Sequence, residues 1–227
     1  MNNQRKIGER GQALLEFVFS LSFLIPLLLG VWVFGSRLVE SQQMTQITRD
    51  VAHMYSRGVD FTCQQCNATQ TGPDGNAQTL ASGFNLTPTG TSVLVLSEIQ
   101  IETQALCTAA VGAGACGNKN LAVFVQQIAI GNLNDGSSYF GTPTSGGTLT
   151  TATALPSALG YYTNVSAVAQ ANSSWAQVNS TFNSSVLNLT SVGAGTVAYM
   201  VEMINKTPTL SVPGMTGSPQ VYARSVF

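Results

Sequence analysis

The sequence predicts an α+β protein in which one long N-terminal helix packs on an antiparallel β-sheet. An apolar run near the start is followed directly by an amphipathic stretch, and then by strand-like segments between loops rich in Gly, Ser and Thr. Strands that follow one long helix, rather than alternating with helices, favour an antiparallel sheet. We therefore expect a cytoplasmic leader at 1–11, a transmembrane helix at 12–35, an amphipathic helical extension at 36–58 and a β-rich extracytoplasmic domain at 59–227.

The apolar run has the length of a membrane span. From Ala13 to Phe34 it holds 22 residues, of which three are polar. At about 1.5 Å per residue such a helix reaches roughly 33 Å, enough for a hydrocarbon core of about 30 Å. Arg5, Lys6 and Arg10 precede the run and Arg37 follows it, so the positive-inside rule predicts a cytoplasmic N-terminus. A cleaved secretory signal is the alternative, but the run exceeds the usual length of about 7–15 residues and no Ala-x-Ala site follows.

Residues 36–58 show the pattern of an amphipathic helix that continues the span. Apolar residues recur there at three- and four-residue steps, and Gly58 is expected to end the helix. One face of this extension should therefore pack on the domain that follows. His53, the only histidine, is expected to be a structural surface residue rather than a catalyst. The apolar face would consist of Leu38, Val39, Met44, Ile47, Val51, Met54 and Tyr55.

Four segments of the remaining chain are typical of strands. Apolar and polar residues alternate over 96–102, a second strand is expected at 121–130 with Val123, Val125, Ile128 and Ile130, and the small, glycine-rich residues 109–117 between them indicate a hairpin turn. A third strand is expected at 195–204 and a fourth at 220–227. We therefore expect an antiparallel sheet with the hairpin as its most clearly marked part.

Four cysteines indicate disulfides in an oxidising compartment, with three possible connectivities. We favour the local pairs Cys63–Cys66 and Cys107–Cys116. A redox role for the C-x-x-C spacing would need a preceding strand and a following helix, whereas here it follows a helix and precedes a loop. Zinc binding is also disfavoured, because eight residues separate the second pair instead of the usual two to four. We expect no metal site.

Composition and motifs give little support for catalysis or nucleic-acid binding. Charged residues make up 8% of the chain, against about 25% typically, and the net charge is −1. Phosphate-binding and nucleophile motifs are missing, and one histidine excludes a two-histidine metal centre. Glu98 and Glu102 lie four apart on one strand, and Asp135 or Glu202 could complete a carboxylate pair, but we expect these acids to face solvent. The sequence predicts neither an enzyme nor a cofactor.

The start of the apolar run resembles the processing site of type IV pilins. Gly11 directly follows Arg10 and lies five residues before Glu16. In that family a membrane prepilin peptidase cleaves after the glycine, and the glutamate at the fifth position of the mature chain faces the new N-terminal amine of a neighbouring subunit. The resemblance implies cleavage between Gly11 and Gln12, with Glu16 as the subunit-pairing residue.

Within that superfamily, Arg-Gly-Gln-Ala-Leu-Leu-Glu-Phe-Val-Phe followed by Pro26 resembles a TadE-like pseudopilin, or minor pilin, of the Flp/Tad tight-adherence system. The resemblance covers roughly residues 5–57. It implies a pilin-like fold and a single-pass protein of the bacterial inner membrane with a periplasmic or extracellular domain. Its implied partners are prepilin peptidase, other pilin and pseudopilin subunits, the Tad inner-membrane platform and the lipid bilayer.

A second interpretation is a membrane-tethered surface adhesin or glycan-binding module that is not built into a pilus. The Asn-, Ser- and Thr-rich composition favours it, together with Tyr161, Tyr162 and Trp175. These aromatic residues belong to 161–189, where the apolar spacing fits a helix and strands equally.

Overall fold

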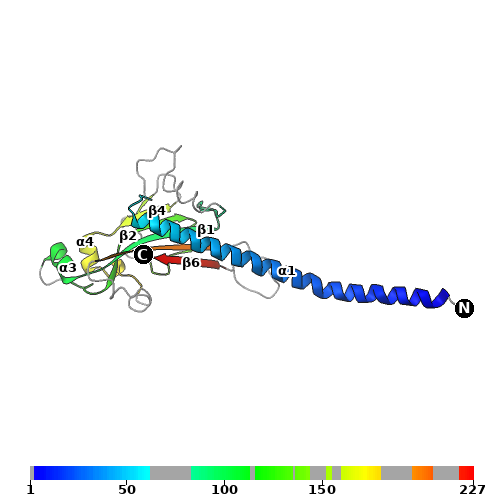
Figure 1. The fold of residues 1–227 in the computed structure, drawn as a ribbon. Helices are drawn as coiled ribbons and strands as arrows, with labels where there is room; N and C mark the ends of the chain where they lie inside the picture. Colours follow the sequence, from blue (N-terminus) through cyan, green and yellow to red (C-terminus); the bar gives the residue numbers. More distant parts are fainter. Residues whose placement is uncertain are drawn as a thin grey trace, which may run out of the picture. The chain divides into compact units, whose positions relative to one another are not determined.

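The computed structural model describes residues 3–61, 83–112, 116–134, 136–143, 152–154, 160–179, 196–206 and 220–227. They form the long helix α1 (Asn3–Ser56) and a six-stranded antiparallel sheet, which confirms the α+β class (Figure 1). The chain divides into two compact units, Met1–Gln42 and Gln43–Phe227, and α1 contributes to both.

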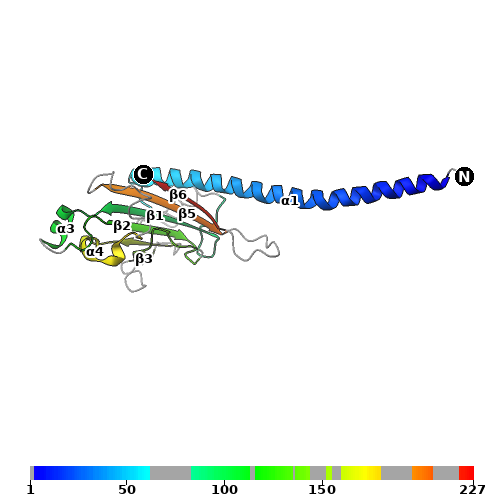
Figure 2. The same ribbon diagram turned by 90° about the horizontal axis from the view of Figure 1, so that it is seen from below.

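The sheet has the strand order β3-β4-β2-β1-β5-β6, and every neighbouring pair is antiparallel (Figure 2). The predicted hairpin is confirmed by the pairing of β1 with β2, and the expected third and fourth strands correspond to β5 and β6. The strands are β1 (Ser92–Ile101), β2 (Ala122–Gly131), β3 (Ala152–Ala154), β4 (Gly160–Asn164), β5 (Val197–Lys206) and β6 (Gln220–Val226).

The connection between β1 and β2 is more than the predicted turn, because it contains the helix α3 (Gln104–Val111). Its Ala, Leu and Gln residues are good helix formers. Thr103 caps the helix by accepting a hydrogen bond from the Leu106 N–H at 3.1 Å. The helix ends at Val111, and the capping residue Gly112 has a φ of 83°, which suits glycine.

A second short helix, α4 (Ala167–Asn172), contacts α3 and is followed by the 3₁₀ turn η1 (Ser174–Ala176). The buried Asn118 joins this region to the start of β2. Its amide group donates to the carbonyls of Gln170 at 2.7 Å and Ser173 at 2.9 Å, and its oxygen accepts from Gln177 at 2.7 Å. Neutral amides thus fix these segments without burying charge.

One face of the sheet is covered by the part of α1 that belongs to the second unit. The buried helix residues recur at three- and four-residue steps, as expected for one face of a helix. They pack in one cluster with Leu94 and Leu96 of β1, and with residues of β2 and β5. The predicted amphipathic extension is therefore confirmed for this part of the helix, whose buried residues are Met44, Ile47, Thr48, Val51, Ala52 and Tyr55.

The predicted extension at 36–58 is wrong at its start and confirmed at its end. Leu38 and Val39 were expected on the packed face, but they are 61% and 53% exposed and lie in the first unit, so that expectation is wrong. The predicted helix end is confirmed, since α1 stops at Ser56 and Gly58 has a φ of 80°.

The opposite face of the sheet is also covered. Phe140 and residues of α4 and η1 pack against Phe124 and Met200, and a smaller cluster forms around Val93 and Val95. Because both faces are buried, the start of β1 reads as the nearly continuous run Val-Leu-Val-Leu instead of a strict alternation.

Candidate functional site

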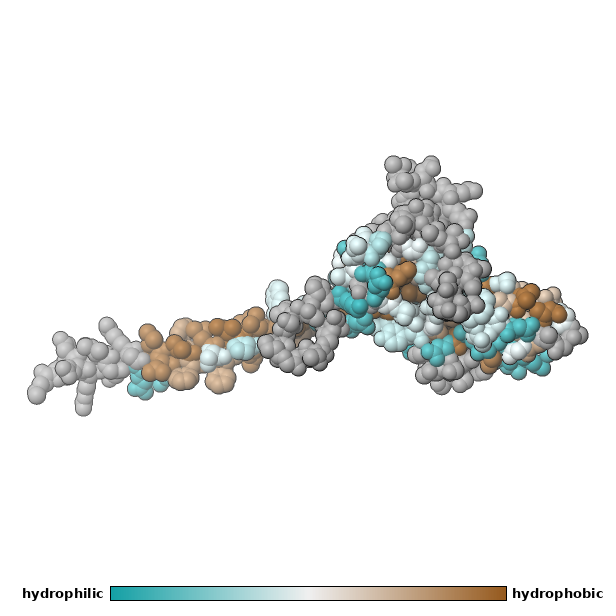
Figure 3. Space-filling view, turned by 180° about the vertical axis from the view of Figure 1, so that it is seen from behind, coloured by the Kyte–Doolittle hydropathy of each residue, from teal (hydrophilic) through white to brown (hydrophobic). Residues whose placement is uncertain are grey.

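The apolar half of α1 leaves its large side chains uncovered. From Leu14 to Val39 most of them are between 51% (Ile25) and 79% (Phe34) exposed, whereas Leu21 and Val33 are partly covered. Figure 3 shows hydrophobic residues gathered along this helix, whereas the described surface of the sheet domain is mixed. Soluble proteins rarely expose an apolar patch of this extent. Among the described residues, one helix is long and apolar enough to cross a membrane, and it is this one.

The polar groups on the apolar helix differ in whether they have a partner nearby on the helix. The hydroxyl of Ser22 donates to the Phe19 carbonyl at 2.7 Å, as expected where water is scarce. Farther along, Arg37 pairs with Glu40 at 3.4 Å. The exposed Glu16 carboxylate, by contrast, forms no hydrogen bond or ion pair within the described part of the chain.

The three predicted processing and pairing residues all lie on α1. The described backbone is helical at Gly11, Gln12 and Glu16. Gln12 and Glu16 are four residues apart, so they share one face of the helix, and both side chains are exposed. The Gly11–Glu16 motif therefore lies at the N-terminal start of the exposed apolar part of α1.

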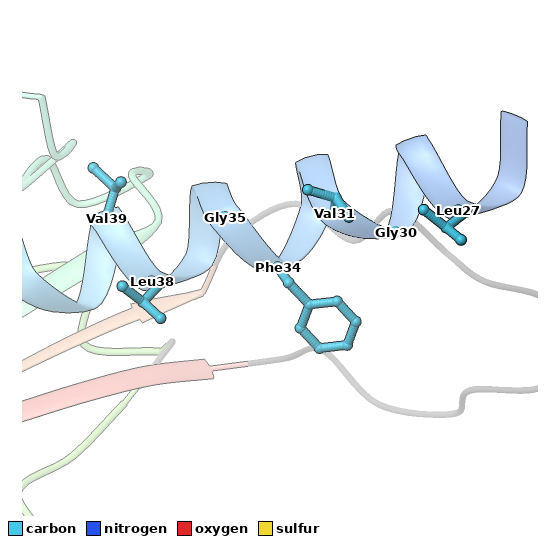
Figure 4. A pocket seen from close by; sticks show the side chains of 7 residues that line it. All are labelled: Leu27, Gly30, Val31, Phe34, Gly35, Leu38 and Val39. Carbon is cyan, nitrogen blue, oxygen red and sulfur yellow. The ribbon is translucent and has the colours of Figure 1, made fainter. Parts of the chain in front are cut away.

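A shallow hollow on the same helix surrounds two glycines. Leu27, Val31 and Phe34 project around Gly30 and Gly35 (Figure 4). A Cβ atom added at either glycine would meet no atom within 4 Å, so nothing in the described chain requires glycine there.

The cysteine prediction is confirmed for the second pair. Cys107 of α3 and Cys116 form a disulfide with their Cα atoms 5.8 Å apart. It links α3 to the turn before β2. The predicted pair Cys63–Cys66 lies outside the described residues.

The acids expected to face solvent are instead largely buried, so that expectation is wrong. Glu202 is 0% and Glu102 1% exposed, and Glu98 is half-buried. They form no carboxylate pair with one another. One oxygen of the Glu102 carboxylate has no hydrogen-bond partner. Burial raises the pKa of this side chain. Asp135 lies outside the described residues.

The burial of Glu202 is compensated by hydrogen-bond donors from the segment that follows β2 and from β6. Its carboxylate accepts hydrogen bonds from the Ser138 hydroxyl, from the Tyr139 N–H at 3.0 Å and from the Tyr222 hydroxyl at 2.8 Å. Burial raises the pKa of Glu202, although these hydrogen bonds and Arg224, its cross-strand neighbour, oppose the shift. An acid inside the apolar run Met-Val-Glu-Met-Ile was a signal that sequence reasoning missed.

A cavity of about 180 Å³ lies at the end of α1, against three strands. Tyr55 and Phe61 line it from the helix end and the segment after it, Glu98 from β1 and Tyr199 from β5. The ring of Tyr55 stands edge-to-face with those of Tyr199 at 5.2 Å and Phe61 at 6.1 Å. Its hydroxyl donates to the Gln126 amide oxygen at 3.3 Å. Sequence patterns did not indicate this site, because its walls come from distant segments.

The aromatic residues that suggested an adhesin are partly packed into the core. Tyr162 packs with the cluster under α1, whereas Tyr161 packs with the cluster on the opposite face of the sheet. Trp175 packs partly against the cluster that contains Phe124. These three rings therefore do not form one binding surface.

Among the described residues, no group of three or more His, Cys, Asp or Glu side chains is arranged to hold a metal ion. No protein-family model matches the chain, and comparisons with curated proteins and with solved structures also give no match.

Proposed function

We propose that this chain is a TadE-like minor pseudopilin that takes part in the assembly or initiation of a tight-adherence type IV pilus or secretion machine. The observation that carries the proposal is the uncovered apolar helix that begins with the Gly11–Glu16 motif and continues into a segment packed on an antiparallel sheet. The proposal places the protein in the bacterial inner membrane, with the sheet domain in the periplasm or outside the cell.

The proposed mechanism begins with prepilin peptidase, which cleaves between Gly11 and Gln12 and frees the Gln12 amine. That amine pairs with Glu16 of an adjacent pilin subunit and sets the axial register. A carboxylate costs about 2.5–3.5 kcal/mol at the centre of a membrane and less near its edge. Because Glu16 has no partner in its own described chain, an external counter-charge would offset this cost.

The hollow around Gly30 and Gly35 supports close packing of this helix with a neighbouring subunit. Small residues allow helix backbones to approach each other in a membrane. The described chain itself leaves open space at both glycines, so a neighbouring helix is the element that would make use of them.

The first test is the N-terminus of the protein isolated from its own host, determined by mass spectrometry. A chain that begins at Gln12 supports the proposal. A chain that begins at Met1 contradicts it and favours the tethered adhesin, and a start beyond Gly35 identifies a cleaved signal peptide.

A second test separates pairing from processing. Glu16→Ala should leave membrane insertion and cleavage intact but reduce co-purification with pilin subunits. Glu40→Gln removes a charge from the same helix at an acid that already has a partner in Arg37, so it serves as the matched control. If Glu16→Ala assembles as well as the control, Glu16 has no role in subunit pairing.

A further inference from the structure

Two acids, Asp60 and Glu98, line the cavity at the end of α1, and Glu98 has no counter-charge there. Glu98 is half-buried and forms no hydrogen bond or ion pair within the described part of the chain. No Lys, Arg or His is found among the described residues that line the cavity. Burial raises the pKa of Glu98. Burial is also the main reason that the pKa values of Tyr55 and Tyr199 are raised, and the nearby Glu98 charge raises both further. The cavity is therefore electrostatically suited to a cation.

The other walls favour an organic cation over a metal ion. Aromatic rings attract ammonium and guanidinium groups through their negative faces, most strongly where water is excluded. Phe61 is 0% and Tyr55 6% exposed, and Tyr199 is half-buried, so the rings lie in a largely desolvated wall. A metal ion would need several oxygen, nitrogen or sulfur ligands, and the described residues offer no such cluster.

The size of the cavity suits one cationic head group. Its volume of about 180 Å³ is several times the roughly 30 Å³ that a water molecule occupies in the liquid. The side-chain oxygen of Gln126 accepts a hydrogen bond from the Tyr55 hydroxyl, which fixes the position of the Tyr55 ring.

We propose that this cavity binds a single alkylammonium or guanidinium group through Glu98, Tyr55 and Tyr199. The group is carried either by a lysine or arginine side chain of a partner protein or by a small free amine. The site goes beyond the pilus role and does not depend on it, since every residue involved lies in the second unit.

The test uses the full chain in detergent micelles with its tyrosine rings isotopically labelled. Six tyrosines give few NMR signals, and Tyr→Phe variants assign them. Butylammonium and butylguanidinium are titrated at constant ionic strength, with butanol as the neutral control. Capped lysine and arginine peptides form a second arm, which distinguishes a protein side chain from a free amine.

We expect saturable shifts of the Tyr55 and Tyr199 signals with the cations and none with butanol. Glu98→Gln should weaken binding at least about tenfold. Asp50→Asn, which removes the same charge from an exposed position of α1 that does not line the cavity, should not weaken it. Tyr199→Leu tests the aromatic wall without changing charge and should also weaken binding.

Three results would overturn the proposal: no saturable shift with either cation, equal weakening by Glu98→Gln and Asp50→Asn, or unchanged binding in Glu98→Gln. Binding by the peptides at least as tight as by the free cations supports a protein side chain as the natural occupant. Binding by the free cations alone supports a small amine.

Discussion

Replacing the buried Glu202 separates the effect of its hydrogen bonds from the effect of its charge. In Glu202→Ala, the Ser138 hydroxyl, the Tyr139 N–H and the Tyr222 hydroxyl all lose their acceptor. Leaving a buried donor unpaired costs about 1–3 kcal/mol. Ser138 is 7% exposed and Tyr222 half-buried, so water cannot fully replace the carboxylate. We expect the free energy of unfolding to fall by about 2–5 kcal/mol.

Glu202→Gln should cost much less, because the amide keeps the shape of the side chain and an acceptor oxygen. It should also change the pH dependence of stability. Burial raises the pKa of Glu202, so the folded state binds the proton more tightly than the unfolded state. This contribution is fully present below the ordinary pKa of 4.5 and is lost as the pH rises through the higher folded-state value. The glutamine variant cannot titrate and should lose less stability over that range.

The assay is denaturation of the full chain in detergent micelles, followed by near-ultraviolet circular dichroism from about pH 4 to about pH 8. Glu98 and Glu102 also have raised pKa values, so the slope of Glu202→Gln should be reduced and not abolished. Equal losses in the alanine and glutamine variants, or an unchanged pH slope in Glu202→Gln, would refute this account of Glu202.

Three further predictions concern the packing of the second unit. Met44→Ala empties a fully buried site under α1 and should lower the free energy of unfolding by about 2–5 kcal/mol in chemical denaturation, whereas Leu38→Ala, at a 61% exposed position, should not. Asn118→Ala removes an amide with three hydrogen bonds and should cost about 1–3 kcal/mol, with faster amide hydrogen exchange in α4. Replacing both Cys107 and Cys116 with Ser should lower the midpoint of thermal unfolding, by an amount corresponding to about 2–4 kcal/mol.

The parts of the fold that sequence could predict are those with a regular local period. Met44, Ile47, Val51 and Tyr55 recur with the helical repeat, and the structure buries all four. The β1–β2 pairing was predictable for a similar reason, since its strands are long and apolar. The helix α3 was missed because its eight residues are too short for a clear period and lead into glycine-rich sequence.

The candidate sites were less predictable, because their geometry depends on contacts far apart in the chain. Glu202 lies 64 residues from Ser138, and no local pattern links a strand acid to a serine in a loop. Likewise, Tyr55 and Gln126 are 71 residues apart. The motif at Gly11 and Glu16 was recognisable from sequence because its residues are near neighbours, whereas the pairing proposed for Glu16 involves a second molecule.

Sparse charge makes the position of each acid informative. In this domain the side-chain amide of Asn118 satisfies two backbone carbonyls without burying a charge. The desolvation cost of a buried acid must then be met by specific partners. Glu202 has three donors within its own chain, whereas Glu98 and Glu16 have neither a hydrogen bond nor an ion pair in the described residues. Of the acids that lack a side-chain hydrogen bond or ion pair in the described residues, Glu16 lies on the apolar helix and Glu98 lines a cavity, so both proposed binding events bring a cation from another molecule to one of these carboxylates.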